Sequence, residues 1–168
     1  MLGDVVGDPG IKAVASWLPG LVRELGPDLV VANGENAAGG FGLTPESADA
    51  LFAAGVDLLT GGNHTWEKKG SAELLDADPR ILRPANYPPG APGRGWARME
   101  KSGASWLVLN LQGREWMKPI DCPFRCADAV LAAEAAGLAV GGEYSSWNRE
   151  PFGAAESAIL VMEAFRPE

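Results

Sequence analysis

Two hydrophobic periods alternate along the first half of the chain, one typical of helices and one typical of buried strands. Apolar residues recur at helical spacing over residues 11–25, where Pro19 is expected to kink the helix or split it in two. An unbroken apolar run at residues 29–32 predicts a strand buried on both faces of a largely parallel sheet, and the largely apolar run at residues 56–60 predicts the next buried strand. This alternation of strands and helices predicts an α/β layered fold.

Local capping residues predict two more helices in the same part of the chain. Thr44 followed by Pro45 is typical of a helix start, and Gly55 is expected to end this helix after Ala54. A short helix is expected at residues 71–77. These helices extend the strand and helix alternation.

The pattern changes after residue 82. Prolines between residues 83 and 94 exclude regular structure there. Residues 96–101 and 106–111, joined by a Ser-Gly turn, predict an antiparallel hairpin. An alanine-rich helix is expected at residues 128–139, and residues 157–165 are either a strand or a short helix.

Length and charge narrow the classes of function. A chain of 168 residues with 46% hydrophobic residues can build one core, so a single domain over residues 1–168 is expected. The formal net charge of -8 and the scattered lysines and arginines argue against binding to duplex nucleic acid. The chain lacks a run of about 18 apolar residues and a signal peptide, which predicts a cytoplasmic protein without a membrane anchor.

Three short polar stretches, each containing glycine, lie where the apolar runs stop. They are Gly3-Asp4-Val5-Val6-Gly7, Asn33-Gly34-Glu35-Asn36 and Gly62-Asn63-His64-Thr65-Trp66. The carboxyl ends of parallel strands meet at one edge of a sheet, where α/β folds build their binding sites, so we expect the stretches to lie together. Taken singly, each stretch is also compatible with an ordinary turn or loop.

Oxygen-donor side chains in these stretches could hold one or two divalent metal ions; they are Asp4, Glu35, Asn36 and Asn63. Carboxylate and amide oxygens suit harder ions such as Mn²⁺ or Mg²⁺. A pair of such ions would activate a water molecule for attack on phosphorus. Glu35 has two carboxylate oxygens and is therefore the natural bridging ligand.

The only histidine of the chain, His64, directly follows Asn63. An imidazole titrates near neutral pH and can protonate a departing oxygen. Metal ions beside His64 would favour its neutral form, so this role requires a compensating partner. We predict His64 as the catalytic proton donor.

Five motifs in this order resemble the YmdB-like bacterial branch of the calcineurin-like metallophosphoesterases. They are Gly-Asp-Val-Val-Gly at residues 3–7, Asn-Gly-Glu-Asn-Ala-Ala at 33–38, Gly-Asn-His-Thr-Trp at 62–66, Arg-Pro-Ala-Asn at 83–86 and Asn-Leu-Gln-Gly-Arg at 110–114. The resemblance runs over about residues 2–128. It implies a layered β-sandwich with flanking helices, two divalent metal ions of iron, manganese or magnesium, and hydrolysis of phosphodiesters that include 2′,3′-cyclic nucleotides.

The resemblance also implies a role for each candidate site residue. Asp4 and Glu35 resemble metal ligands, with Glu35 bridging the two ions. Asn63 resembles a ligand of the second metal, and Asn36 resembles a neighbouring ligand. His64 resembles the proton donor. The expected partner is a small phosphodiester or a nucleotide.

The later part of the chain departs from this family. In the family, three further histidines complete the metal centre, in motifs resembling Asp-Phe-His-Ala-Glu and Gly-Thr-His-Thr-His. This chain has one histidine in total. Residues 129–168 do not resemble the family, and the first strand is short, so we expect a fold truncated at both ends. An oxygen-only half site leaves coordination positions to water, which predicts weak metal binding and impaired hydrolysis.

Two other classes of function remain open at this point. A non-catalytic module could retain the fold and bind a nucleotide or another protein. A Rossmann-like dinucleotide binder is disfavoured because residues 3–10 do not match the pattern G-x-G-x-x-G and Pro9 removes an amide that a pyrophosphate would use. A homo-oligomer is compatible with every one of these readings.

Overall fold

The computed structural model describes residues 1–134, 139–144 and 161–165 of the chain. It divides into two compact units. The first comprises Met1–Arg83 and Pro92–Arg94, and the second comprises Pro84–Ala91 and Gly95–Glu168. A single domain over the whole chain stays a prediction.

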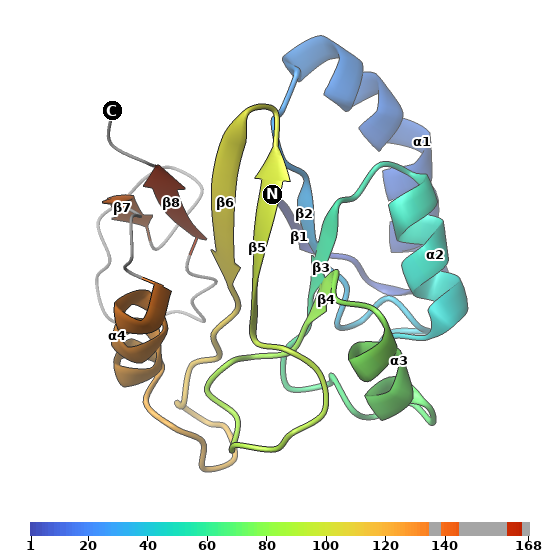
Figure 1. Ribbon diagram of the computed structural model, residues 1–168. Helices are drawn as coiled ribbons and strands as arrows, with labels where there is room; N and C mark the ends of the chain where they lie inside the picture. The colour runs from blue at the N-terminus through green and yellow to red at the C-terminus, as the bar shows by residue number, and fades with distance from the viewer. Residues whose placement is uncertain (135–138, 145–160, 166–168) are drawn as a thin grey trace. The chain divides into compact units, whose positions relative to one another are not determined.

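The first unit is a parallel sheet with helices on one side. Its strand order is β1-β2-β3-β4, with every neighbouring pair parallel. The strands are β1 (Leu2–Asp4), β2 (Val31–Asn33), β3 (Leu58–Thr60) and β4 (Ile81–Leu82). The helices between them are α1 (Gly7–Leu25), α2 (Pro45–Ala53) and α3 (Ser71–Ala77), and all three lie on the same side of the sheet (Figure 1). The predicted α/β class is confirmed.

Helix α1 differs from its prediction at its start and at Pro19. The segment Gly7–Gly10 forms the first turn of the helix. The amide of Gly10 donates to the carbonyl of Val6 at 3.1 Å, and the residues before Gly10 have no intrahelical acceptor, so Pro9 costs no hydrogen bond. The helix then continues through Pro19, so of the two expected outcomes, a kink or a split, the split does not occur. Leu18 and Val22, on either side of the proline, pack against the core and compensate for the hydrogen bond that Pro19 cannot make.

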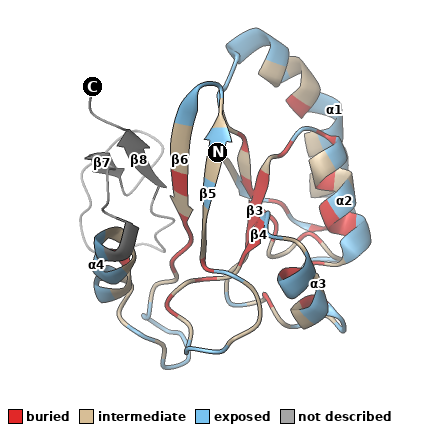
Figure 2. Cartoon of the chain, viewed as in Figure 1, coloured by how far each residue is buried: buried red, intermediate tan, exposed pale blue. Residues whose placement is uncertain are grey.

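Strands β2 and β3 are shorter than their apolar runs. The Asp57 side chain accepts a hydrogen bond of 2.8 Å from the amide of Val30, so this amide pairs with a carboxylate instead of a neighbouring strand. All three residues of β3 are buried, as expected of a strand covered on both faces (Figure 2). Between the two strands, Thr44 and Ser47 form the capping box that starts α2. The predicted start of this helix is confirmed.

The second unit contains the predicted hairpin. Strands β5 (Trp96–Lys101) and β6 (Ala104–Leu109) pair antiparallel, and the hairpin prediction is confirmed with β6 two residues closer to the turn. Ser102 and Gly103 have φ angles of 54° and 78°, which is typical of the two-residue turn that matches strand twist. Helix α4 (Pro123–Glu134) packs residues 126, 127, 130 and 131 against Leu109 and Leu111.

The last predicted elements are partly wrong. Ala139 belongs to strand β7 (Ala139–Tyr144) and not to the predicted helix 128–139, which in the structure begins at Pro123 as α4. Strand β8 (Val161–Phe165) pairs antiparallel with β7, so this part of the ambiguous segment is a strand. Residues 135–138 and 157–160 lie outside the described residues.

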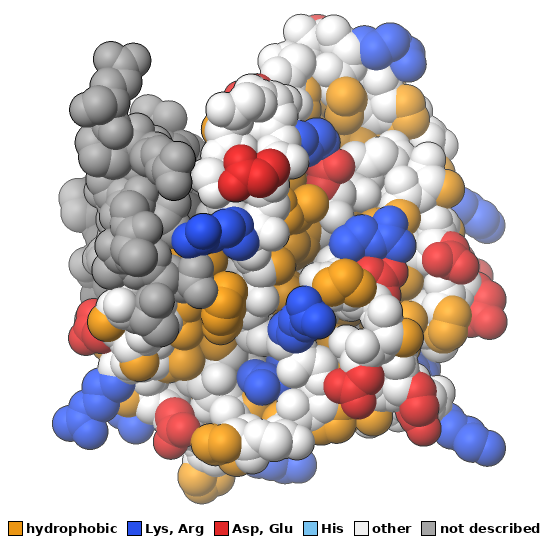
Figure 3. Space-filling model, viewed as in Figure 1, with side chains coloured by type: hydrophobic (Ala, Val, Ile, Leu, Met, Phe, Trp, Pro, Cys, Tyr) orange, Lys and Arg blue, Asp and Glu red, His pale blue; other side chains and the backbone are white. Residues whose placement is uncertain are grey.

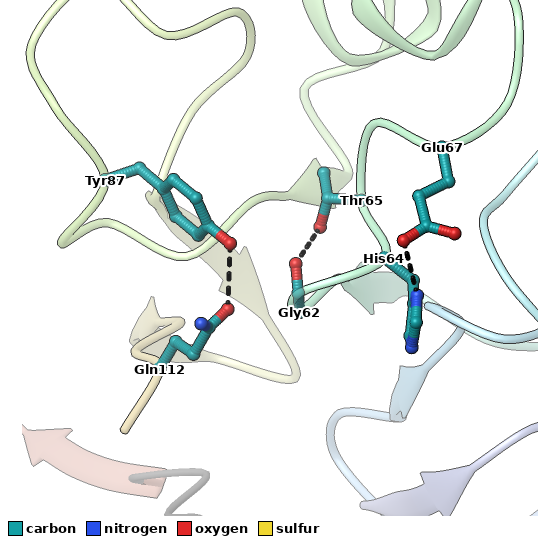
Figure 4. Close-up of polar contacts among 6 residues, drawn as sticks. All are labelled: Gly62, His64, Thr65, Glu67, Tyr87 and Gln112. Carbon is teal, nitrogen blue, oxygen red and sulfur yellow. Dashed lines mark hydrogen bonds and ion pairs between the residues drawn. The ribbon is translucent and has the colours of Figure 1, made fainter. Parts of the chain in front are cut away.

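A buried asparagine connects two of the five motifs inside the second unit. Asn86 is 1% exposed, and its amide nitrogen donates to the carbonyl groups of Gln112 at 2.8 Å and Asp121 at 2.9 Å. Its side-chain oxygen accepts from the amide of Gln112 at 2.9 Å. The neighbouring Tyr87 hydroxyl donates to the Gln112 side-chain oxygen at 3.1 Å (Figure 4). These contacts give the motifs at 83–86 and 110–114 a structural role.

The surface agrees with the low basic content of the sequence. On the face shown in Figure 3, the lysine and arginine side chains of the described residues stand apart from one another. The ammonium group of Lys68 lies over the ring of Phe41, 3.6 Å from its centre. Among the described residues, every helix is too short or too polar to cross a membrane.

Candidate metal centre

The three polar stretches meet at the carboxyl edge of the parallel sheet, as their positions predict. The amide of Val5 donates to the carbonyl of Asn33 at 3.0 Å, and the amide of Gly34 donates to the carbonyl of Thr60 at 3.0 Å. A third bond of 2.9 Å runs from the Gly7 amide to the Asn36 carbonyl. Backbone hydrogen bonds therefore fix the loop after each strand against its neighbour.

Asp4 and Asn36 form a direct side-chain pair at this edge. The amide nitrogen Nδ2 of Asn36 donates to Oδ2 of Asp4 at 2.8 Å. This bond turns the other end of the amide away from Asp4. The Asn36 Oδ1 atom is buried and has no hydrogen-bond partner in the structure. A buried oxygen in this state needs a partner, which a cation or an ordered water would supply.

Glu35 stands at the centre of the candidate site. Its amide donates to the side chain of buried Asn33 at 3.3 Å, which fixes the turn that presents the carboxylate. The carboxylate lies directly on Gly62, where a β-carbon would overlap it. Its Oε2 atom is buried without a hydrogen-bond partner.

Burial raises the pKa of Glu35, and the negative charge of Asp4 raises it further. The backbone amides of His64 and Asn63 act in the opposite direction and lower this pKa, but less than burial raises it. The ionised carboxylate therefore carries an electrostatic cost at this edge. A bound cation would relieve that cost, because it compensates both carboxylates at once.

His64 has a partner that the sequence pattern did not identify. Its Nδ1 atom lies 2.8 Å from Oε1 of Glu67, three residues later (Figure 4). A carboxylate accepting from Nδ1–H selects one tautomer and leaves Nε2 for another group. Glu67 thus supplies the compensating negative charge that a proton-donor role requires. The acidic residue three positions after the histidine was the sequence signal that could have predicted this pairing.

Replacing Glu67 by alanine should change the tautomer of the neutral imidazole. We expect the preference for Nδ1–H to fall roughly fivefold, which corresponds to about 1 kcal/mol for a partly exposed pair. Nitrogen-15 NMR measures this directly, because the chain has one histidine and therefore one set of imidazole signals. Glu73→Ala is a control with the same change in charge, and an unaltered spectrum in Glu67→Ala would refute the pairing.

Asn63 is the least constrained of the predicted ligands. Its side chain is exposed, and its contact with the site runs through its backbone amide beside Glu35. The structure thus gathers Asp4, Glu35 and Asn36 with the backbone of residues 63 and 64. Metal binding by these side chains and the catalytic role of His64 stay predictions.

These residues fit part of a metal site. The donors are carboxylate and amide oxygens, which suit hard divalent cations, and the two oxygens without partners belong to Glu35 and Asn36. Within residues 1–134, 139–144 and 161–165, no three His, Cys, Asp or Glu side chains form a group that could hold a metal ion. The described donors alone would leave several coordination positions to water.

Comparisons with known proteins agree on one family. The family model described as YmdB-like protein matches residues 1–140. A 2′,3′-cyclic-nucleotide 2′-phosphodiesterase of Bacillus subtilis (strain 168) is 43% identical over 134 residues, which cover 80% of this chain and 51% of that protein.

Two crystal structures resemble the chain with a TM-score of 0.73 each. A hypothetical protein from Thermus thermophilus is 47% identical, over 77% of this chain and 50% of that one. A novel phosphatase from Mycoplasma pneumoniae is 30% identical, over 78% of this chain and 49% of that one. The chain spans about half the length of these relatives.

Proposed function

The chain belongs to the YmdB-like protein family, and we propose that it carries the first half of a metal-dependent phosphodiester hydrolase acting on 2′,3′-cyclic nucleotides. The observation that carries this proposal is the state of Glu35. Its half-buried carboxylate lies beside a second carboxylate and keeps one oxygen without a partner, so a bound cation would stabilise its ionised form. The substrate class comes from the Bacillus relative, which is a 2′,3′-cyclic-nucleotide 2′-phosphodiesterase.

In this proposal the metal ions are Mn²⁺, Mg²⁺ or iron, and four side chains would hold them. Asp4 and Glu35 contribute carboxylates, and Asn36 and Asn63 contribute amide oxygens. When bound, such ions supply Lewis-acid polarisation of the phosphoryl group. The bond between Asn36 and Asp4 orients both groups before any ion arrives.

His64 would protonate the oxygen that leaves phosphorus. Breaking a phosphodiester expels an alkoxide, which needs a proton at neutral pH. Glu67 holds the Nδ1–H of the imidazole, so Nε2 is the nitrogen that would carry the transferred proton. The Gly61-Gly62 turn places His64 after β3, with its backbone amide at Glu35.

We further propose that the chain of 168 residues alone binds metal weakly and turns over slowly. Its described donors amount to part of a coordination set, and each missing ligand lowers affinity. The matched part of the chain covers about half of each relative, so the remaining ligands would come from residues outside the matched part or from a second chain.

A non-catalytic binding module is the second candidate function. The small number of metal ligands favours this candidate, since the described residues contain no group of three His, Cys, Asp or Glu side chains that could hold a metal ion. Such a module would keep the fold and bind a nucleotide without hydrolysing it. Metal binding at Glu35 separates the two candidates.

Replacing Glu35 by glutamine should remove the metal affinity of the chain. We expect isothermal titration to show weak Mn²⁺ binding to the unaltered chain and about 10-fold to 100-fold weaker binding to Glu35→Gln, since the substitution neutralises the central ligand. Any hydrolysis of 2′,3′-cyclic AMP should disappear in parallel.

Glu24→Gln is the matched control, because it makes the same change on the exposed surface of α1. It should leave both measurements unaltered. Equal Mn²⁺ affinity in the Glu35 and Glu24 variants would contradict the proposed centre. Binding of a cyclic nucleotide without Mn²⁺ dependence or turnover would favour the non-catalytic module.

A further inference from the structure

A small cavity in the first unit adjoins the Glu35 carboxylate. It lies between the carboxyl ends of β2 and β3 and helix α3, and its volume, measured as the space open to a water-sized sphere, is about 10 Å³. One buried water molecule needs about 10 to 15 Å³ on this measure, together with two to four polar partners. The cavity therefore has room for a single water.

Three residues that carry hydroxyl groups line this cavity, and two of these hydroxyls are already committed as donors. Thr65 Oγ1 donates to the carbonyl of Gly62 at 2.6 Å (Figure 4), and Ser71 Oγ donates to the carbonyl of Lys68 at 2.5 Å. Thr60 is the third. It is 3% exposed, and its Oγ1 atom has no hydrogen-bond partner in the structure.

Glu35 also lines the cavity, and its Oε2 atom is the second buried polar atom without a hydrogen-bond partner. Buried hydroxyl and carboxylate groups are almost always hydrogen-bonded to protein or to ordered water. Thr60 has a proton to give and Glu35 has lone pairs to receive, yet the two groups do not bond directly. A water molecule can accept from one and donate to the other.

We propose that this cavity binds one ordered water molecule, which accepts a hydrogen bond from Thr60 and donates one to Oε2 of Glu35. The oxygens of Thr65 and Ser71 can receive its second proton, which gives the water up to three partners. Thr60 is thereby a positioning residue that acts on Glu35 through the water. Its effect on metal binding rests on the proposed function, whereas the water site itself does not.

The first test is crystallographic and uses the full chain without metal. High-resolution structures should show a water within hydrogen-bond distance of Thr60 and Glu35 in the unaltered protein and in Thr60→Ser, which keeps the hydroxyl. The water should be absent from Thr60→Val, which has nearly the same shape and no hydroxyl. A cavity without a water, or a Thr60 hydroxyl bonded to a backbone carbonyl, would overturn the proposal.

The second test is titration with Mn²⁺. Thr60→Val should bind Mn²⁺ about 10-fold more weakly than the unaltered chain, as is usual when a group that orients a ligand is lost. Thr60→Ser should retain the affinity, which a role in packing alone would not predict. Equal affinity in Thr60→Val and Thr60→Ser would refute the positioning role of Thr60.

The two tests separate this proposal from the proposed function. If the unaltered chain binds no Mn²⁺, the metal centre is refuted while the crystallographic water still decides the cavity. Thermal unfolding followed by circular dichroism shows whether each of the two Thr60 variants is folded. If Thr60→Val does not fold, the water in the unaltered protein and in Thr60→Ser remains decisive.

Discussion

Gly62→Ala is expected to weaken Mn²⁺ binding by about 10-fold to 100-fold, because it displaces the central carboxylate of the site. A β-carbon at residue 62 would lie 2.5 Å from Cδ and 2.8 Å from Oε1 of Glu35, closer than such atoms approach in proteins. The Glu35 carboxylate is the end of a flexible side chain, so it can swing away at little cost. Metal affinity should fall while thermal stability changes little.

Gly20→Ala is the control for this substitution. Residue 20 lies within α1, where the nearest atom to an added β-carbon is 4.0 Å away on Arg23. This variant should keep the Mn²⁺ affinity and gain about 0.5 to 1 kcal/mol of stability from helix propensity. Unchanged titration curves for Gly62→Ala would show that Glu35 is not the central ligand.

Asn86→Ala is expected to lower the free energy of unfolding by about 3 kcal/mol, since each unpaired buried polar group costs about 1 to 3 kcal/mol. The substitution removes three hydrogen bonds and leaves an amide and a carbonyl of Gln112 and a carbonyl of Asp121 without their partners. Urea unfolding followed by circular dichroism measures the change.

Two variants test the origin of that loss. Asn63→Ala makes the same chemical change at an exposed position and should stay within about 0.5 kcal/mol of the unaltered chain. Asn86→Asp keeps an oxygen for the Gln112 amide but cannot donate, so it should also be strongly destabilised. A mild effect of Asn86→Ala would mean that the network has little weight in folding.

Elements with local signals were predicted well from the sequence. The start of α2 depends on Thr44 and Pro45, and the hairpin turn depends on Ser102 and Gly103, which adopt positive φ angles. In both cases the residues that specify the element lie within it or directly beside it. The sequence of that segment is therefore enough to predict the element.

Elements that depend on distant partners were predicted less well. Helix α1 survives Pro19 because its neighbours pack on a core formed by other segments. Strand β2 begins only at Val31, because the amide of Val30 bonds to Asp57, 27 residues later. Strand β4 has two residues and exists through its pairing with β3. Hydrophobic periodicity contains no information about such contacts.

The same division holds for the candidate site. The order of the three polar stretches at strand ends predicted that Asp4, Glu35 and Asn36 lie at one edge of the sheet. The overlap of the Glu35 carboxylate with the space at Gly62, and the free hydroxyl of Thr60, depend on side-chain directions. These features became visible only with atomic positions.

The order of strands in the first unit has a consequence for synthesis on the ribosome. Each strand pairs with the next one in the chain, so no pairing skips over a later strand. Chains fold from the N-terminus as they emerge from the ribosome. Asp4, His64 and Glu67 can therefore reach their places before the hairpin of the second unit has been translated.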